Sequence, residues 1–399
     1  MFNKRIANYD VYKIVISLSL IITIVTCSYL RLTNTDGIIL NSDLTCNFRE
    51  EVYINDFITY LDGKLVDNYQ VDTNEVGFHD VIITYKNNYG FIVSKKITIE
   101  VKDITGPIIE VSNPYVIEKG SINNLEDTIL CADDYDDGIS CHIKGEYDLD
   151  KVGEYSLEIS ASDKSGNTTS KSFILKVVEP SETNQSNKEI KYTSFKTIYQ
   201  KYKEEDVYIG VDISKWQKEV DFKELKKQGI DFVMLKIGGQ SKIGGELEID
   251  PMFYNNLKEV INNDIQVGIY FYSYAKSEKE ALEQADWVIE KLKGKDIDLP
   301  IVFDWENWDQ YSQFQISFHT LNKVASAFLS RVEEYHYKGM LYASKYYLDL
   351  VWYQDDYRNW LAYYNEDFSN YQDYYMWQVC SNGKIEGIDT LVDIDIMKK

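Results

Sequence analysis

Two short acidic strand patterns, about ninety residues apart, constrain the fold of this chain most. Residues 208–217 read YIGVDISKWQ and residues 300–306 read PIVFDWE. Each is an apolar run typical of a buried β-strand, and the runs end on Asp212 and on Asp304 and Glu306. Strands of one parallel sheet would bring these three acids to the same edge. Convergent carboxylates are what a glycoside hydrolase needs, because one group acts as the acid and another as nucleophile, base or charge stabiliser.

Length and charge limit the remaining possibilities. A chain of 399 residues predicts two to three domains, and an apolar content of 44% is enough for buried cores. The net charge of −23 argues against a nucleic-acid partner, because nothing here would offset phosphate repulsion. It also gives no attraction to an anionic cell wall or membrane surface, so an enzyme acting there would need a tether.

The N-terminal region predicts that tether. Residues 14–30, IVISLSLIITIVTCSYL, carry no charge and lie between Lys13 and Arg31. With Lys4 and Arg5 also before the run, the positive residues favour an orientation with the N-terminus in the cytoplasm. Seventeen residues are few for a membrane span and many for a signal-peptide core, but no A-x-A cleavage site follows. We therefore favour an uncleaved signal anchor (residues 1–31) over a cleaved signal; both place the rest of the chain outside the cytoplasm.

Cysteine usage agrees with export. Cys131 and Cys141 could close a short loop as a disulfide, which leaves Cys46 and Cys380 as free thiols. With no CxxC pattern, no His/Cys cluster and only four histidines, we expect no metal site of the zinc type and no cofactor.

An internal repeat fills the region after the apolar run. Residues 76–101 align without a gap on residues 152–177, at an offset of 76. Apolar residues alternate on either side of Asn/Gly or Ser/Gly turns, which predicts β-hairpins. Two such units, residues 32–103 and 104–179, resemble the immunoglobulin-like β-sandwiches of bacterial surface proteins. We favour a role as spacers over one in binding the wall or a partner.

Residues 180–206 are polar and predict a linker, with one short helix near 195–202. The remaining segment, 207–399, contains eight strand-like runs, at 208–214, 232–238, 266–273, 300–306, 338–344, 360–365, 374–380 and 391–396. The first five alternate with helical patterns, which predicts β/α units in a parallel sheet. One helix begins at Asp221 and stops at Gly229, and another begins at Ser277 and stops at Gly294.

The last two runs change the expected topology. Only ten residues separate them, too few for a parallel crossover, so the eighth strand is predicted to be antiparallel to the seventh. The result is an irregular α/β barrel resembling a TIM barrel, with about five β/α units and extra strands. Because an antiparallel strand begins at the edge where the others end, Asp393 would join the other three acids.

The motifs of segment 207–399 resemble those of glycoside hydrolase family 25, the lysozymes that cut bacterial peptidoglycan. The matching motifs occur in the family's order and at its spacing, and they are GVDISKWQ, GIYFYSYA (268–275), FDWEN (303–307), MLYAS (340–344), WLAYYN (360–365), MWQ (376–378) and LVDID (391–395). The resemblance implies cleavage between N-acetylmuramic acid and N-acetylglucosamine. It implies Glu306 as general acid, with Asp304, Asp212 and Asp393 lining the same site.

The roles of these groups follow from their expected surroundings. Burial and neighbouring carboxylates would raise the pKa of Glu306 and keep it protonated, while Asp304 stays ionised and stabilises positive charge or orients the substrate N-acetyl group. Asp395 is expected to be structural or salt-bridged. The side chains expected to bind substrate are Tyr270, Tyr272, Trp305, Tyr342, Tyr363, Trp377 and Gln378.

Two alternatives stay open at this point. A barrel of this kind could bind wall glycan without cutting it, and the chain could be a structural surface protein dominated by its sandwiches. The intact acid set favours a peptidoglycan hydrolase on the cell-wall side of the membrane, because a glycan-binding protein has no need of Glu306.

Overall fold

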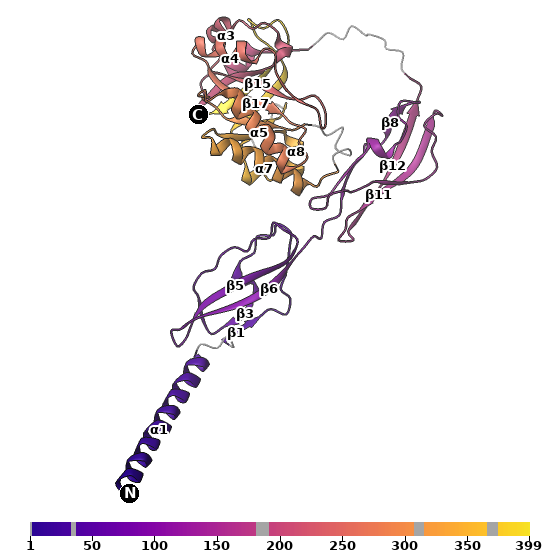
Figure 1. Ribbon diagram of the computed structural model, residues 1–399. Coiled ribbons are helices and arrows are strands. Elements are labelled where there is room, and N and C mark those ends of the chain that lie inside the picture. Colours follow the sequence, from indigo (N-terminus) through magenta and orange to yellow (C-terminus); the bar gives the residue numbers. More distant parts are fainter. Residues whose placement is uncertain (1, 33–36, 181–190, 307–314, 365–373) are drawn as a thin grey trace. The chain divides into compact units, whose positions relative to one another are not determined.

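The computed structural model describes residues 2–32, 37–180, 191–306, 315–364 and 374–399, and the chain divides into two compact units, Met1–Ile104 and Thr105–Lys399. Helix α1 (Phe2–Leu32) opens the first unit (Figure 1). Its stretch Tyr12–Leu30, with a mean hydropathy of 2.0, is long and apolar enough to cross a membrane. A signal sequence meets the same criterion, so the choice between anchor and cleaved signal stays a prediction.

The rest of the first unit is all β. Strands β1 (Ile38–Leu40) and β3 (Ile58–Leu61) form an antiparallel pair. A second sheet has the order β2-β6-β5-β4, with strands β2 (Thr45–Asn47), β4 (Gly63–Leu65), β5 (Gly77–Asn87) and β6 (Ile92–Lys102). The inward-facing side chains of β5 and β6 alternate with exposed ones, as period-two runs require.

The second unit begins with a related all-β region. One sheet has the order β10-β11-β12-β8, with strands β8 (Tyr115–Glu118), β10 (His142–Lys144), β11 (Gly153–Ser162) and β12 (Thr168–Val178). Strands β7 (Ile108–Glu110) and β9 (Leu130–Ala132) form a separate pair. We refer to residues 105–180 as the second sandwich. Its immunoglobulin-like class stays a prediction.

The internal repeat is confirmed as two matching hairpins. Gly77 pairs with Val101 in the first, and Gly153 pairs with Val177 in the second, the same register at an offset of 76. Cys131 and Cys141 form a disulfide, a pairing that the sequence left open, whereas Cys46 and Cys380 are buried free thiols.

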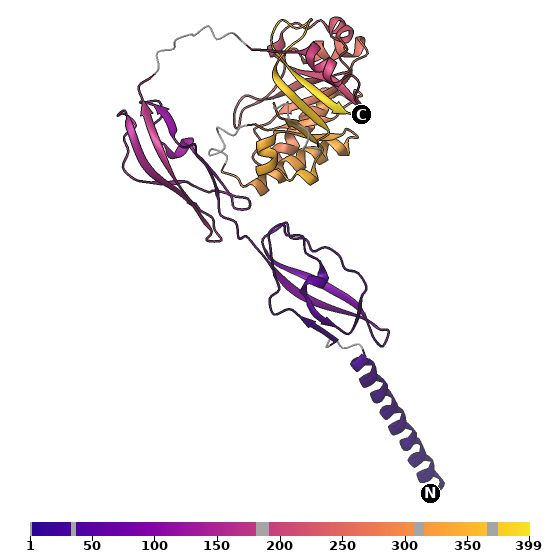
Figure 2. The ribbon, with the colours of Figure 1, turned by 180° about the vertical axis from the view of Figure 1, so that it is seen from behind.

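A closed barrel of eight strands occupies the C-terminal part, at the positions predicted. Its strands are β14 (Val207–Ile213), β15 (Phe232–Gln240), β17 (Gln266–Tyr272), β18 (Ile301–Asp304), β19 (Gly339–Ser344), β20 (Asn359–Ala362), β21 (Met376–Lys384) and β22 (Val392–Lys398). The neighbours from β14 to β21 are parallel, and β22 closes the barrel by pairing antiparallel with both β21 and β14. The antiparallel yellow pair is in view in Figure 2.

In the part of the barrel that the structure describes, five helices alternate with the first strands, as expected; they are labelled in Figure 1. They are α3 (Phe222–Gln228), α4 (Phe253–Asn262), α5 (Glu278–Leu292), α7 (Phe318–Glu334) and α8 (Lys345–Leu350). Asp221 caps α3 through a hydrogen bond from the Glu224 N–H, and Gly229 ends it in the left-handed conformation. Ser277 caps α5, but that helix ends one residue before the predicted glycine, because Lys293 itself adopts the left-handed conformation.

The chain before β14 also packs on the barrel. Strand β13 (Thr193–Ser194) pairs with β21, and helix α2 (Phe195–Tyr202) forms at the predicted residues. The Phe195 side chain lies in the core between the barrel and its helices.

Two apolar cores place the polar site at one end of the barrel. The larger core lies between the strands and the surrounding helices. The smaller one fills the barrel interior with side chains that include Met234, Val302, Met340 and Met376. Carboxyl, amide and hydroxyl groups replace these apolar side chains toward the carboxyl ends of the parallel strands.

Candidate active site

A cavity of about 200 Å³ opens at the carboxyl ends of the parallel strands. It is lined by Asp212, Ser214, Trp216, Gln217, Lys236, Tyr270, Tyr272, Asp304, Glu306, Tyr342, Trp360, Gln378 and Asp393. The structure therefore brings together all four acids that the sequence singled out.

Strand geometry accounts for the convergence of the acids. Asp212 on β14 and Asp393 on β22 are register partners across the antiparallel junction. Asp304 ends β18, and Glu306 follows two residues later on the same side of the chain. Asp212 and Asp304 are 7% and 5% exposed, whereas Glu306 is exposed at the cavity mouth.

Asp304 and Glu306 behave as a coupled pair. Burial and then the Glu306 charge raise the pKa of Asp304 well above its usual value, although the charge of Lys236 opposes this. Withdrawal from bulk water raises the pKa of Glu306 to a smaller extent. A hydrogen bond between the two carboxyl groups raises the pKa of Asp304 and lowers that of Glu306. Both carboxyl groups are therefore easier to protonate than free ones, and the expectation that Asp304 stays ionised remains a prediction.

A second group of acids lies beside this pair. Burial, followed by the charge of Asp393, raises the pKa of Asp212 well above its usual value. Burial and the Glu306 charge raise the pKa of Asp393 to about 6. Asp395 points into the barrel interior, fully buried, and accepts a hydrogen bond of 2.9 Å from the Trp360 indole N–H. Burial and then the charges of Asp212 and Asp393 also raise the pKa of Asp395. The expectation that Asp395 is structural or salt-bridged stays a prediction.

Gln378 connects the acids to the aromatic wall. Its amide nitrogen donates to Asp212 Oδ2 at 2.9 Å and to Asp393 Oδ2 at 3.4 Å. Its amide oxygen accepts from the Tyr342 hydroxyl at 3.0 Å and from the Tyr364 hydroxyl at 2.7 Å. Every polar atom of this amide therefore has a partner, which fixes the side chain between the carboxylates and the tyrosines.

Four of the seven side chains expected to bind substrate line the cavity, namely Tyr270, Tyr272, Tyr342 and Gln378. The other three do not. Trp305 is fully buried on the helix side and donates to the Ala275 carbonyl at 3.3 Å. Trp377 is 4% exposed and donates to the Tyr363 carbonyl at 2.8 Å, and Tyr363 packs against the outer core.

Lys236 is a charged cavity residue that the sequence analysis did not single out. It lies on β15, and its ammonium is 4.5 Å from the centroid of the Tyr272 ring. Its positive charge lowers the pKa of both Asp304 and Glu306. The available signal was a lone lysine in the otherwise apolar run FVMLKIGG.

The comparisons agree with this geometry. Residues 211–388 match the family model described as glycosyl hydrolases family 25. A protein named as uncharacterized, YegX of Escherichia coli strain K12, is 26% identical over 192 residues, which are 47% of this chain and 68% of that protein.

Solved structures with a similar fold include the spore cortex lytic enzyme SleM of Clostridium perfringens. It is 25% identical, with a TM-score of 0.41, over 48% of this chain and 67% of that one. A family 25 glycosyl hydrolase from Bacillus anthracis is 22% identical, with a TM-score of 0.41, over 48% of this chain and 89% of that one. The assignment of residues 211–388 as a glycosyl hydrolase family 25 domain rests on the family-model match.

Proposed function

We propose that this chain hydrolyses peptidoglycan at the β-1,4 bond between N-acetylmuramic acid and N-acetylglucosamine. The observation that carries the proposal is the convergence of Glu306, Asp304, Asp212 and Asp393 in one cavity at the end of the barrel, most of which matches the family 25 model. Four carboxyl groups held together at one barrel end repel one another when ionised, which is a cost that a purely glycan-binding surface has no need to bear.

Glu306 is the proposed general acid. Its raised pKa and its exposed position let it meet the glycosidic oxygen while protonated. Its proton moves to the leaving oxygen as the bond from the anomeric carbon to that oxygen breaks. A water molecule then adds hydroxide to the anomeric carbon and returns its proton to the Glu306 carboxylate, so the enzyme is regenerated.

Asp304 is proposed to act on the substrate N-acetyl group. Its carboxyl group is close enough to Glu306 to share a hydrogen bond. In this proposal Asp304 orients the N-acetyl oxygen toward the anomeric carbon, or stabilises the positive charge that develops there.

The remaining residues of the cavity position the sugar. We assign hydroxyl recognition to Asp212, Asp393 and Gln378, which share one hydrogen-bond network. Tyr270, Tyr272 and Tyr342 provide aromatic surface beside the acids.

The test is cleavage of purified peptidoglycan by the full chain and by Glu306→Gln. Glutamine keeps the shape of the side chain but cannot donate the proton, so turnover is expected to fall about 10²–10⁴-fold while glycan binding persists. Glu219→Gln, an exposed change of the same kind outside the cavity, serves as the matched control. If the Glu306 variant kept more than a tenth of wild-type turnover, another group would be the acid.

The products identify the bond that is cut. We expect new reducing ends on N-acetylmuramic acid, detected by mass spectrometry after borohydride reduction. Reduced N-acetylglucosamine ends would make the enzyme a glucosaminidase, and intact glycan with tight binding would make the chain a glycan-binding surface protein.

We also propose that α1 holds the enzyme in the membrane, with the barrel on the cell-wall side. The apolar stretch Tyr12–Leu30 supports this, together with the positive residues that precede it. The all-β region between helix and barrel would then act at least partly as a spacer.

A further inference from the structure

A loop of the second sandwich contacts the barrel. Residues 133–138 follow strand β9, and we call them the docking loop. They lie between Cys131 and Cys141, so the disulfide closes the chain around them. Their contacts reach residues 315–319 of the barrel, about 180 positions further along the sequence.

The docking loop completes the first turn of helix α7. The first N–H groups of a helix have no acceptor within the helix and need partners from elsewhere. The Phe318 N–H donates to the Asp133 carbonyl and the His319 N–H donates to the Asp134 carbonyl, both at 2.9 Å. Within the helix the Thr320 N–H is capped by the Ser317 hydroxyl at 3.0 Å. The sandwich therefore supplies two consecutive acceptors that the barrel sequence does not.

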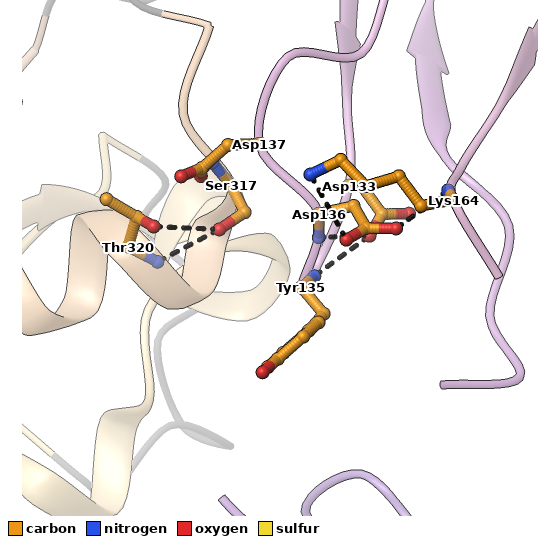
Figure 3. A network of polar contacts seen from close by, with 7 residues as sticks. All are labelled: Asp133, Tyr135, Asp136, Asp137, Lys164, Ser317 and Thr320. Atoms are coloured by element: carbon orange, nitrogen blue, oxygen red, sulfur yellow. Dashed lines mark hydrogen bonds and ion pairs between the residues drawn. The ribbon is translucent and has the colours of Figure 1, made fainter. Parts of the chain in front are cut away.

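Side chains strengthen the same contact. The Asp137 carboxylate accepts from the Ser317 N–H at 2.6 Å, which also places a negative charge at the positive end of the helix (Figure 3). In the opposite direction, the Gly138 N–H donates to the Gln315 carbonyl at 2.9 Å. The Tyr135 ring stacks on the His319 ring, with centroids 5.2 Å apart.

The docking loop is itself rigidly held. Asp133 Oδ1 accepts from the N–H groups of Tyr135 and Asp136, at 2.9 and 2.7 Å (Figure 3). Asp136 in turn accepts from the Lys164 N–H at 2.7 Å, which joins the loop to the turn between β11 and β12. A loop fixed in this way loses little further entropy when it binds the helix.

Apolar contacts extend the interface beyond the loop. Ala132 is 2% exposed and belongs to the same core cluster as the barrel and its helices. Ile108 on β7 and Leu130 on β9 are partly buried against that cluster. The second sandwich and the barrel thus share part of one core.

Helix α7 connects the docking loop to the strand that carries Asp304. The Phe328 ring on α7 packs against Phe303 on β18, with centroids 5.2 Å apart, and against Phe271 on β17, at 5.8 Å. Phe303 immediately precedes Asp304, and Phe271 precedes Tyr272, so both contacts lie directly behind cavity residues. A shift of α7 would therefore displace β18, since close-packed cores transmit displacement.

We propose that the docking loop positions the active site by holding the N-terminus of α7 in place. The second sandwich then contributes to the geometry of the active site, in addition to any role as a spacer. The catalytic part of this inference rests on the proposed hydrolase function. Asp137 and Tyr135 are positioning residues, because they act through α7 and lie outside the cavity.

The experiment compares the full chain with the double variant Tyr135→Ala/Asp137→Ala. Hydrogen exchange by mass spectrometry over residues 315–321 reports the clamp directly. We expect exchange of these amides to rise about tenfold in the double variant, because the first-turn N–H groups lose their ordered acceptors. We expect kcat on labelled peptidoglycan to fall about tenfold with a smaller change in KM, since misplacement of the acids affects the chemical step.

Two further variants separate positioning from general destabilisation. Asp137→Asn keeps an oxygen acceptor for the Ser317 N–H and should restore most of the exchange protection and kcat. Glu146→Gln, which removes an exposed acid elsewhere in the same sandwich, should change neither. All rates are measured well below the unfolding temperature of each variant.

The outcomes are distinct. Equal exchange in wild type and double variant would show that the loop does not hold the helix, and the proposal would fail. Faster exchange with unchanged kcat would show that the second sandwich docks on the barrel only as a spacer. The proposed positioning of the active site would then be overturned as well. An inactive wild-type chain would count against the hydrolase function and so against the catalytic role, while the exchange data would still decide whether the clamp exists.

Discussion

Single residues in the cavity differ in how strongly they hold a proton. Asp212, Asp304 and Asp395 are buried acids, each with a pKa well above its usual value, and Asp393 has a pKa of about 6. Each of these groups is more easily protonated in the folded chain than in the unfolded chain. The stability that they contribute is therefore fully present below the unfolded pKa of about 3.9 and is lost as the pH rises through the folded value.

Asp393→Asn is expected to stabilise the barrel at neutral and alkaline pH. Asparagine does not ionise, so the variant avoids the loss that Asp393 suffers between about pH 4 and pH 6. The gain in the free energy of unfolding should be at most about 3 kcal/mol at pH 8 and should vanish near pH 4. Thermal unfolding across this pH range measures it. A gain that grew toward acid pH would contradict the assigned direction of the pKa shift.

Lys236→Met should move the pH profile of cleavage toward alkaline pH. The Lys236 charge lowers the pKa of Glu306, and methionine keeps most of the side-chain volume without the charge. The acid would then stay protonated to a higher pH. The alkaline limb of kcat against pH is the measurement, and Lys242→Met, an exposed lysine outside the cavity, is the control. A shift toward acid pH would exclude this role for Lys236.

The acids could be predicted from the sequence because each ends or begins a recognisable strand. The aromatic side chains that bind substrate were predicted less well, and the physical reason can be read from the sequence. Trp305 stands between Asp304 and Glu306, and Trp377 stands next to Gln378. Since alternate residues of a strand face opposite sides, both tryptophans point to the helix side when their neighbours face the cavity. Lys236 could not be predicted, because one lysine in a strand gives no indication of which charges surround it.

At the scale of secondary-structure elements, helix α7 supports the acidic strand β18 from the outer side of the barrel. Phe328 is fully buried and contacts both Phe303 and Phe271. Phe328→Ala should lower the free energy of unfolding by about 3–5 kcal/mol, because it leaves a cavity behind β18. Denaturant unfolding of the full chain measures this. A loss below about 1 kcal/mol would mean that the helix closes the gap and supports the strand only weakly.

The disulfide is the second element-scale feature. Cys131→Ser/Cys141→Ser opens the ring of chain that contains the docking loop. From the loop-closure entropy we expect the second sandwich to lose about 3 kcal/mol of stability. Thermal unfolding of the variant should match that of the reduced wild-type chain. Identical unfolding of oxidised and reduced wild type would show that the disulfide adds nothing.

Strands and helices were predicted well because their periodicity and caps are local signals. The eight barrel strands, the short helix α2 and the antiparallel last strand all follow from nearby residues. The docking loop could not be predicted in this way. Its carbonyl groups bind the N-terminus of α7, which lies about 180 positions further along the sequence. Every residue has a backbone carbonyl group, so the identity of the side chains does not reveal which carbonyl groups act as acceptors.

At the scale of the whole molecule, the proposed tether makes a prediction about location. Fractionation of the native host should recover the full chain in the membrane, and protease added to intact protoplasts should digest the barrel. The physical reason is the uncharged stretch Tyr12–Leu30 with positive residues before it. A soluble chain beginning near residue 31 in the medium would indicate a cleaved signal, and protection from protease would reverse the orientation.

The antiparallel strand β22 has a consequence for biosynthesis. It follows the other seven barrel strands in the chain, and it alone joins β21 to β14. A nascent barrel therefore stays open until β22 has emerged, and until then the site lacks Asp393 and its inner support Asp395. Until that point in synthesis the chain has no finished active site. The strand that closes the barrel also sets the time at which the chain could first cut its substrate.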